Sequence, residues 1–221
     1  MTITHHPSEA TQLAYAAGSL DEGLAVVVAT HLATCPGCRQ AIRVSEAVGG
    51  QLLAALEGEA MAADALSHAL ARLDTPVVAR RAPGFAREAR GFAPAGIGFP
   101  LPHALRPYRL GNWRWIAPGV RHIRVLARRS GRSGLHLLRI SPGTAMPGHG
   151  HEGNELTCIL TGSYTDETGR FQAGDLVEMD TELEHRPMAD ARDGCICLIA
   201  TDGRLRFHSL LPRLLQPILG F

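Results

Sequence analysis

The chain has 221 residues, of which 45% are hydrophobic, so it is long enough to form two small domains or one large domain with a sizeable core. This composition excludes a disordered or collagen-like chain. All 22 basic residues are arginine, and they nearly balance 21 acidic residues to give a net charge of +1. Eleven histidines and five cysteines are a large supply of transition-metal ligands, so metal binding is the first chemistry to look for.

The near-neutral total hides three segments of unlike charge. Residues 1–74 hold 3 Arg and 8 acidic residues (net −5), residues 75–140 hold 13 Arg and 1 acidic residue (net +12), and residues 141–221 hold 6 Arg and 12 acidic residues (net −6). This asymmetry predicts separate modules with separate partners, although arginines can also line the solvent-facing side of a strand.

The sequence also predicts a compartment. The N-terminus has no basic stretch followed by an apolar core, and no apolar run approaches the roughly 20 residues needed to span a bilayer. We therefore expect a cytoplasmic protein without a membrane partner. In that reducing compartment, Cys35 and Cys38 are expected to be metal ligands or a redox pair rather than a structural disulfide.

The N-terminal third is predicted to be helical, because it is rich in Ala and Leu and lacks the alternation of a strand. Asp21 and Glu22 suit the first turn of a helix that runs to about Thr34. A second helix is expected after the turn that ends at Cys38. A shorter helix over residues 64–73 would complete a small bundle.

The rest of the chain is predicted to be a linker followed by an antiparallel β domain. Residues 75–107 contain six prolines and four glycines, which is typical of an interdomain linker. Short apolar stretches separated by turns then predict an antiparallel sandwich or barrel, with strands at residues 123–127, 135–140, 156–160, 176–179 and 195–200. The final residues, 209–221, are expected to dock as a short helix or clasp.

A first group of metal ligands lies in the helical segment. His31 and Cys35 are four residues apart on a predicted helix, so they project from one face. Cys38 lies across a Pro-Gly turn that can bring both sulfurs to one ion, and His5 or His6 can supply a fourth ligand. Thiolates with imidazoles in a closed tetrahedron are typical of structural zinc. The alternative is a reduced cysteine pair at a helix N-terminus with an incidental histidine.

The His-x3-Cys-x2-Cys spacing resembles the zinc-binding anti-sigma factors of bacteria. The opening, in which His-His is followed by Ala-Tyr-Ala-Ala-Gly-x-Leu, resembles their ChrR subgroup, in which a small helical domain precedes a cupin. The resemblance implies zinc on His6, His31, Cys35 and Cys38. It also implies that the helical domain wraps around an extracytoplasmic-function sigma factor and covers the surfaces that contact RNA polymerase. An acidic module of net −5 suits a basic partner of that kind.

A second group of metal ligands lies in the predicted β domain. His149 and His151 share one face of a strand, and Glu155 follows after a turn, so the three side chains can converge on one ion. Together with Gly143 and Gly162, their spacing resembles the first cupin motif.

A second cupin motif would begin at Gly174, and His185 stands where its histidine ligand falls. The chain departs from the family pattern at Asp180, Glu182 and Ala189, where the resemblance expects Pro, Gly and Asn. Three imidazoles and one carboxylate suit Zn, Fe, Mn or Ni, and the resemblance favours zinc. We therefore expect two zinc ions per chain, one in each domain. The alternative is a vestigial cupin whose histidines only line a turn.

Two further features have competing interpretations. Cys195 and Cys197 would share one face of a strand, either as an oxidation-sensitive pair near the cupin metal or as two small buried core residues. The arginines of residues 121–139 could bind nucleic acid, but their alternation with apolar residues favours the polar face of strands.

The resemblance implies an anti-sigma factor, not an enzyme. Residues 1–74 would be the zinc-binding anti-sigma domain, residues 75–107 a linker, and residues 108–221 a cupin-like sensor of singlet oxygen or a related oxidant, whose altered state releases the sigma factor. The expected partner is the sigma factor rather than nucleic acid. A competing hypothesis is a metal-dependent cupin enzyme, such as a dioxygenase or isomerase, with an accessory zinc domain. A third is a DNA-binding regulator that uses the arginine-rich middle.

Overall fold

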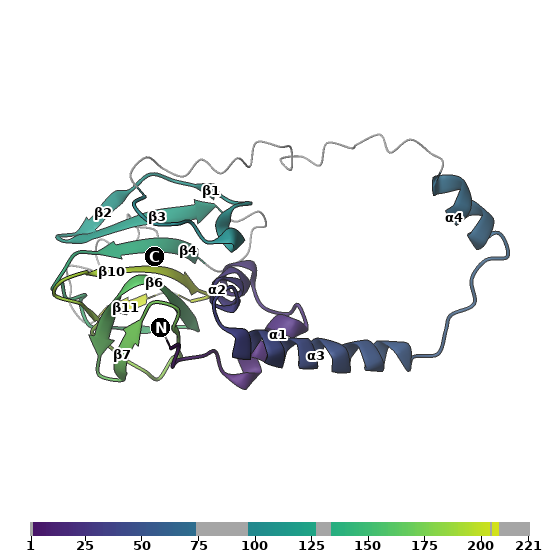
Figure 1. The fold of residues 1–221 in the computed structure, drawn as a ribbon, viewed down its shortest axis with the longest axis horizontal. Helices are drawn as coiled ribbons and strands as arrows, with labels where there is room; N and C mark the ends of the chain where they lie inside the picture. Colours follow the sequence, from purple (N-terminus) through teal and green to yellow (C-terminus); the bar gives the residue numbers. More distant parts are fainter. Residues whose placement is uncertain (1, 74–96, 127–133, 204, 208–221) are drawn as a thin grey trace.

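The computed structural model describes residues 2–73, 97–126, 134–203 and 205–207. Helices come first and antiparallel strands follow, as the sequence predicts (Figure 1). The helices are α1 (Glu9–Ala16), α2 (Glu22–Leu32), α3 (Pro36–Ala54), α4 (Ala65–Leu73) and the short 3-10 helix η1 (His103–Leu105). Within these described ranges, none of the helices has the length and apolar character needed to cross a membrane. We call residues 2–73 the helical module. The strands that come after it are called the β module.

Local sequence signals determine where the helices begin. Ser8 caps α1 and Asp21 caps α2, and each side chain accepts a hydrogen bond from a backbone N–H in the first turn of its helix. Cys35 is the N-cap of α3, and its sulfur accepts from the N–H of Cys38. The predicted turn before Cys38 is therefore wrong, because Pro36 suits the first position of a helix and α3 already begins there.

The small bundle that the sequence predicts is not completed by α4. Helices α1, α2 and α3 contact one another beside the β module, whereas α3 extends outward and α4 lies apart from the rest (Figure 1). Helix α2 buries its apolar residues against the sheet, with Val27 and Val28 both 0% exposed, so it packs on the β module rather than on α4.

The strands pair antiparallel throughout the described part of the β module. They are β1 (Arg109–Leu110), β2 (Arg114–Ala117), β3 (Val120–Leu126), β4 (Gly134–Ile140), β5 (His149–His151), β6 (Glu155–Asp166), β7 (Gly169–Gln172), β8 (Leu176–Met179), β9 (Met188–Ala189), β10 (Cys195–Thr201) and β11 (Leu205–Phe207). The order is β1-β3-β4-β10-β6-β7, with β2 on β3, β8 and β9 on β6, and β5 on β11. All five predicted strand stretches are confirmed, as β3, β4, β6, β8 and β10.

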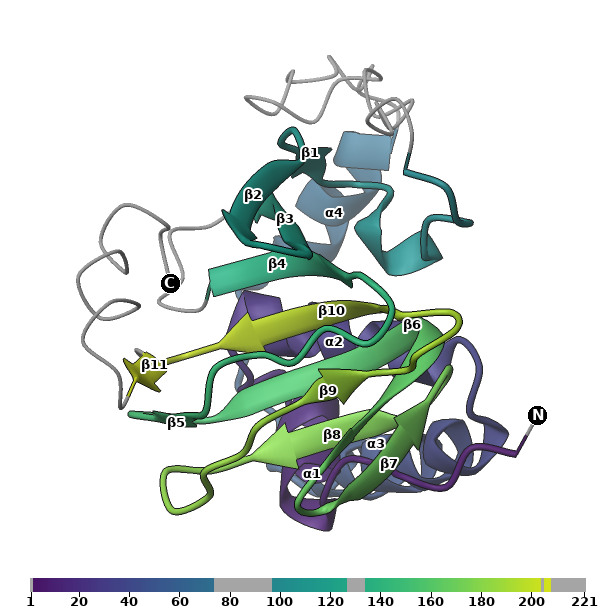
Figure 2. The same cartoon turned by 90° about the vertical axis from the view of Figure 1, so that its left-hand side faces the viewer.

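Strand β6 is the longest, and its two halves have different partners. Its first half pairs with β10 and β8, and its second half pairs with β7 and β9, so the sheet curves around it (Figure 2). Curvature of this kind encloses an interior, which is filled by apolar residues of β6, β8 and β10. The predicted clasp over residues 209–221 and the linker residues 75–96 lie outside the described residues.

The helical module and the β module share one hydrophobic core. Val27 and Val28 of α2 lie in the same buried cluster as Leu156 of β6 and Leu198 of β10, on the outer face of the sheet. Leu105 of η1 is fully buried in this cluster, and residues 97–101, from the end of the predicted linker, pack against it. Each such side chain contributes roughly 1.5–3 kcal/mol when it is fully buried, so this contact is a firm docking of one module on the other.

Candidate metal centres

The four candidate ligands of the helical module converge. Each of His6, His31, Cys35 and Cys38 offers one ligand atom, and these atoms all lie within 4.8 Å of one another. The Nδ1 atom of His6 is 3.5 Å from the sulfur of Cys35 and 3.4 Å from that of Cys38, and Nε2 of His31 is 3.3 Å from the sulfur of Cys38. His5 turns away, with its Nδ1 3.4 Å from a carboxylate oxygen of Asp175. Of the two histidines left open by the sequence, the structure places His6 beside the sulfurs.

Burial controls the protonation of this cluster. Burial and the neighbouring Cys35 raise the pKa of the Cys38 thiol to about 12, and burial lowers the pKa of His31. Without a cation, the thiol therefore stays protonated and the imidazole stays neutral. A bound cation reverses this preference by stabilising thiolates. Two sulfurs and two imidazole nitrogens that converge at one point are the donor set of a structural zinc ion, and the residues present fit it.

The β module orients one of these ligands. Nδ1 of His31 lies 2.8 Å from the carbonyl oxygen of Gly174, just before β8. Because a carbonyl oxygen can only accept, Nδ1 carries the proton and Nε2 directs its lone pair at the sulfurs. A metal-binding histidine is commonly held in this way through its other ring nitrogen.

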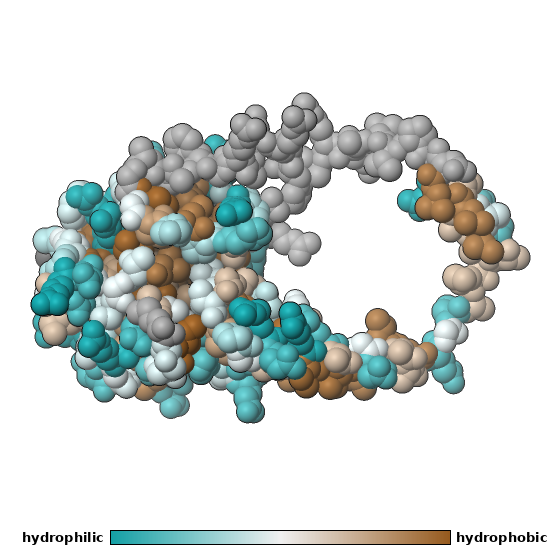
Figure 3. Space-filling model, viewed as in Figure 1, coloured by the Kyte–Doolittle hydropathy of each residue, from teal (hydrophilic) through white to brown (hydrophobic). Residues whose placement is uncertain are grey.

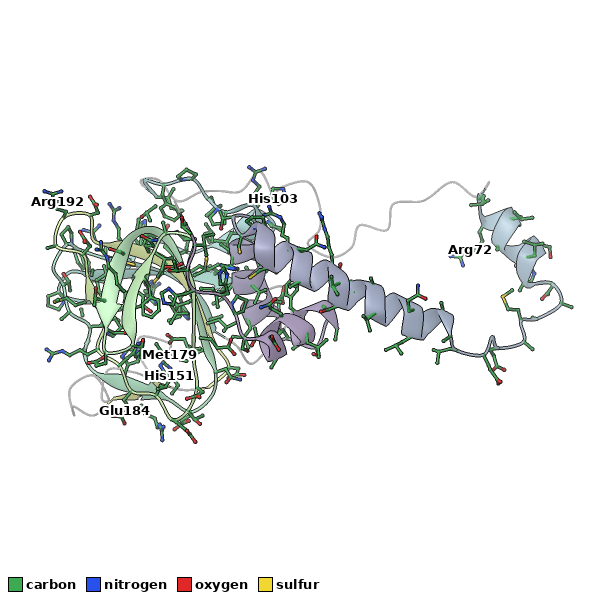
Figure 4. All side chains as sticks on the ribbon, turned by 60° about the horizontal axis from the view of Figure 1, so that its bottom comes forward. Arg72, His103, His151, Met179, Glu184 and Arg192 are labelled. Atoms are coloured by element: carbon green, nitrogen blue, oxygen red, sulfur yellow. The ribbon has the colours of Figure 1, made fainter. Side chains whose placement is uncertain are left out.

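The three candidate histidine ligands of the β module also converge. His149 and His151 lie on β5, and His185 reaches them through an isolated bridge to His149. All three are buried, and one ring nitrogen from each lies within 4.8 Å of the others. Figure 4 shows His151 inside the β module beside Met179, far from α4.

The hydrogen bonds of His149 and His185 leave two lone pairs facing each other. Nδ1 of His149 donates to the carbonyl oxygen of Pro147 at 2.9 Å, and Nδ1 of His185 donates to Asp166 at 2.9 Å. The two Nε2 atoms are then unprotonated and only 3.2 Å apart. Such an approach is unfavourable unless a cation or a proton lies between the two nitrogens, so this geometry fits a metal ion.

Glu155 stands beside the three histidines but outside their tight cluster. Its Oε2 is 3.4 Å from Nδ1 of His151, and within the described residues neither this oxygen nor either ring nitrogen of His151 has a hydrogen-bond partner. Burial raises the pKa of Glu155 to about 8. Burial and the neighbouring His149 and His185 lower the pKa of His151 to about 3. Buried polar atoms without partners are costly, and a cation held by three imidazoles and this carboxylate would satisfy them.

Asp166 is a part of this centre that sequence reasoning missed. It accepts the Nδ1–H of His185, and although burial opposes it, hydrogen bonds from Thr168 and His185 lower the pKa of Asp166. A carboxylate behind a metal-binding histidine fixes the ring and strengthens the ligand. No spacing rule indicates this pair, because the curvature of β6 brings the two side chains together.

Comparison with known proteins decides the family. The curated anti-sigma-E factor ChrR of Cereibacter sphaeroides is 43% identical over 217 residues, which is 98% of each chain. The crystal structure of Rhodobacter sphaeroides SigE in complex with the anti-sigma ChrR matches 91% of this chain and 100% of that chain, with 39% identity and a TM-score of 0.71. This chain belongs to the ChrR family of anti-sigma factors. It is therefore a regulator rather than an enzyme, and the dioxygenase or isomerase alternative is set aside.

Two family models match separate parts of this ChrR-family chain. A zinc-finger model matches residues 13–39, which include His31, Cys35 and Cys38, and the ChrR cupin-like domain matches residues 108–203, which include the second group of ligands. Both the helical zinc-binding region and the antiparallel cupin-like fold are thus as predicted. We refer to the β module as the cupin from here on.

The remaining candidates of the sequence analysis belong to neither group of converging ligands. Cys195 and Cys197 are buried in the interior cluster of the cupin, and the adjacent Cys195 together with burial raises the pKa of Cys197. A protonated buried thiol is a poor nucleophile, so Cys197 is unreactive in the resting protein, and both cysteines are buried core residues. Arg121, Arg124 and Arg139 are exposed and lie between buried residues of β3 and β4, but Arg121 and Arg124 are three residues apart on β3 and so do not share one polar face; Arg128, Arg129 and Arg132 lie outside the described residues.

Proposed function

We propose that this ChrR-family protein binds and inhibits an extracytoplasmic-function sigma factor through its helical module. The observation that carries the proposal is an apolar stripe on two helices that have no partner for it within the described chain. The stripe consists of Val44, Val48, Leu52, Leu53 and Leu56 on and just after α3, and of Leu66, Leu70 and Leu73 on α4. The comparison with SigE-bound ChrR supports the same class of partner.

The stripe has the form of a protein-binding surface. Val44, Val48 and Leu52 follow one another at four-residue intervals, so they lie along one face of α3, and Leu66 and Leu70 do the same on α4. Both helices extend beyond the cupin, and Figure 3 shows apolar residues exposed on each of them. Exposed apolar faces of this kind are rare on monomers and mark interaction sites. Two separated amphipathic helices are suited to clasp a partner between them.

Co-purification with a sigma factor tests this function. The full-length chain should retain an extracytoplasmic-function sigma factor on an affinity column. The double variant Cys35→Ser/Cys38→Ser should lose it, because the zinc ligands hold the start of α3 against α2. The matched variant Cys195→Ser/Cys197→Ser removes two cysteines from the cupin and should keep the partner. Equal retention by both double variants would contradict the role given to the zinc centre.

We also propose the identity of both metal centres. In the helical module, zinc would be held by His6, His31, Cys35 and Cys38. In the cupin, a second zinc would be held by His149, His151, Glu155 and His185. Each ion would supply a fixed crosslink among its ligands rather than reaction chemistry.

Metal analysis separates the two centres. The wild-type chain should contain two zinc ions, and the variants Cys35→Ser/Cys38→Ser and His149→Ala/His151→Ala should each contain one. Two ions in either double variant would show that the ligands have been wrongly assigned.

We further propose that the cupin senses singlet oxygen or a related oxidant and that this signal releases the sigma factor. The functional modules would then be residues 1–74 for inhibition, residues 75–107 as a linker and residues 108–221 for sensing. Cys195 and Cys197 are candidate oxidation sites, although their burial requires the cupin to open before they react.

Illumination of the sigma complex with a singlet-oxygen photosensitiser tests the sensing role. The wild-type complex should dissociate, and mass spectrometry should find oxygen added to the cupin. The Cys195→Ser/Cys197→Ser complex should dissociate more slowly. Release at the same rate from both complexes would eliminate these cysteines as the sensor.

A further inference from the structure

A turn of the cupin contacts the helical module at two of its four candidate zinc ligands. It contacts His31 directly, and it contacts the backbone just before His6. The turn is formed by Gly174 and Asp175, between β7 and β8. The carbonyl oxygen of Gly174 accepts the Nδ1–H of His31 at 2.8 Å. The carboxylate of Asp175 accepts the backbone N–H groups of Thr4 at 2.8 Å and His5 at 3.1 Å. The side chain of Asp175 is 0% exposed, so these bonds are made away from water.

The N-terminal strap, residues 2–8, is fastened on both sides of His6. Before His6, the carbonyl oxygen of His5 accepts from the backbone N–H of Leu176 at 3.1 Å. After it, the backbone N–H of Ser8 donates to Glu178 at 2.9 Å. The imidazole of His6, between these points, reaches the two zinc-ligand sulfurs. Strand β8 therefore holds the backbone that delivers His6.

The chemistry of the turn suits this contact with the strap. Gly174 has a positive φ of +95°, and a Cβ there would lie 2.9 Å from a side-chain carbon of Ile3. A larger residue would strain the turn and push the strap away. The second carboxylate oxygen of Asp175 accepts from the N–H of Gln172 at 2.9 Å. One carboxylate thus closes the turn and holds the strap at the same time.

We propose that the Gly174–Asp175 turn is the outer coordination shell of the zinc centre in the helical module, with Asp175 as a positioning residue. The turn orients His31 through a carbonyl oxygen and His6 through the strap, so the cupin controls how firmly the helical module holds its metal. The inference rests on the proposed zinc ligands. It goes beyond them by assigning part of the zinc affinity to a domain that supplies none of the ligands.

Cobalt(II) gives a readout that is specific to this centre. Cobalt bound to cysteine shows thiolate-to-metal charge transfer, and the proposed cupin ligands include no sulfur. Loss of this band during titration of the full-length, cobalt-loaded protein with a chelator therefore measures the affinity of the helical module alone. Loss of an outer-shell partner typically weakens metal binding about 10- to 100-fold.

Asp175→Asn is the decisive variant, because its amide places a donor against backbone N–H groups while it preserves the shape of the side chain. Asp190→Asn is the matched control, since Asp190 also accepts two backbone N–H groups in a cupin turn but does not contact the strap. Asp175→Asn should bind cobalt about 10-fold or more weakly, and Asp190→Asn should match the wild type. Glu178→Ala, which loosens the partly exposed end of the strap, should weaken binding in the same direction and provides a test if Asp175→Asn does not fold.

The outcomes separate this inference from the zinc assignment itself. Wild-type cobalt affinity in a folded Asp175→Asn variant, or in Glu178→Ala if the first variant does not fold, would overturn the positioning role. Absence of the charge-transfer band from the wild-type protein would instead overturn the proposed zinc ligands.

Discussion

The apolar stripe makes a quantitative prediction for the double variant Leu66→Ala/Leu70→Ala. These leucines lie one turn apart on α4 and are 69% and 53% exposed, so most of their apolar surface is available to a partner. Full burial of a leucine contributes roughly 1.5–3 kcal/mol, and about half of that remains to be gained at these positions. Losing both side chains should therefore cost about 1.5–3 kcal/mol of binding free energy. The affinity for the sigma factor should fall roughly 10- to 150-fold.

Isothermal titration of a purified sigma factor with the wild-type and variant chains measures this change. The thermal stability of the free chain should hardly move, because both leucines are exposed and alanine is a good helix former. Met188→Ala is the control, since Met188 is also 53% exposed but lies on β9 of the cupin. Wild-type affinity in the leucine variant, or an equal loss in Met188→Ala, would refute the assignment of the stripe.

Three further changes test the cupin centre, the burial of a core histidine and the docking of the modules. Asp166→Asn should weaken zinc binding by the cupin about 10- to 100-fold in a chelator titration, because His185 loses its carboxylate partner; unchanged affinity would contradict this role. Burial and, to a lesser extent, the neighbouring His122 lower the pKa of His136 to about 3. The neutral imidazole therefore makes its full contribution to the free energy of unfolding above about pH 6.5, and this contribution is lost as the pH falls towards 3. Relative to His136→Gln, the wild type should lose about 1.4 kcal/mol of unfolding free energy between about pH 7.5 and 5.5, and a constant difference in denaturant titrations would contradict the shift. Val28→Ala should cost about 2 kcal/mol in urea unfolding, whereas a cost below about 0.5 kcal/mol would show that α2 is not docked on the sheet.

Local signals in the sequence were sufficient for helices α2, α3 and α4, for five of the strands and for most candidate ligands. The N-caps Ser8 and Asp21 act within one turn of helix, and the spacing from His31 to Cys38 places three ligand atoms together without reference to the rest of the fold. The strand stretches were equally local, because alternation and turns are visible within a few residues. The same reasoning placed the start of α3 about one turn too late, after Cys38 instead of at Pro36. The reason is that the helix-starting effect of Pro36 competes with the turn tendency of Pro-Gly.

Contacts between distant segments could not be predicted from the sequence. The apolar residues of α2 would suit a helical bundle as well as the outer face of a sheet, and only the folded chain shows that they pack on β6 and β10. The place of His6 depends on the strap along β8, which no spacing rule describes. Asp166 likewise meets His185 only because β6 curves. Each of these contacts joins residues whose separation in the chain carries no periodic signal.

Inhibition of a sigma factor by the helical module is the proposed function on which the other proposals depend. In vitro transcription from a promoter that depends on an extracytoplasmic-function sigma factor, with purified RNA polymerase and increasing amounts of the zinc-loaded full-length chain, tests it most directly. Transcripts should disappear as the chain reaches one equivalent of sigma factor, and the Leu66→Ala/Leu70→Ala variant should require a large excess. Undiminished transcription at saturating amounts of wild-type chain, with each such sigma factor of the source organism, would contradict it.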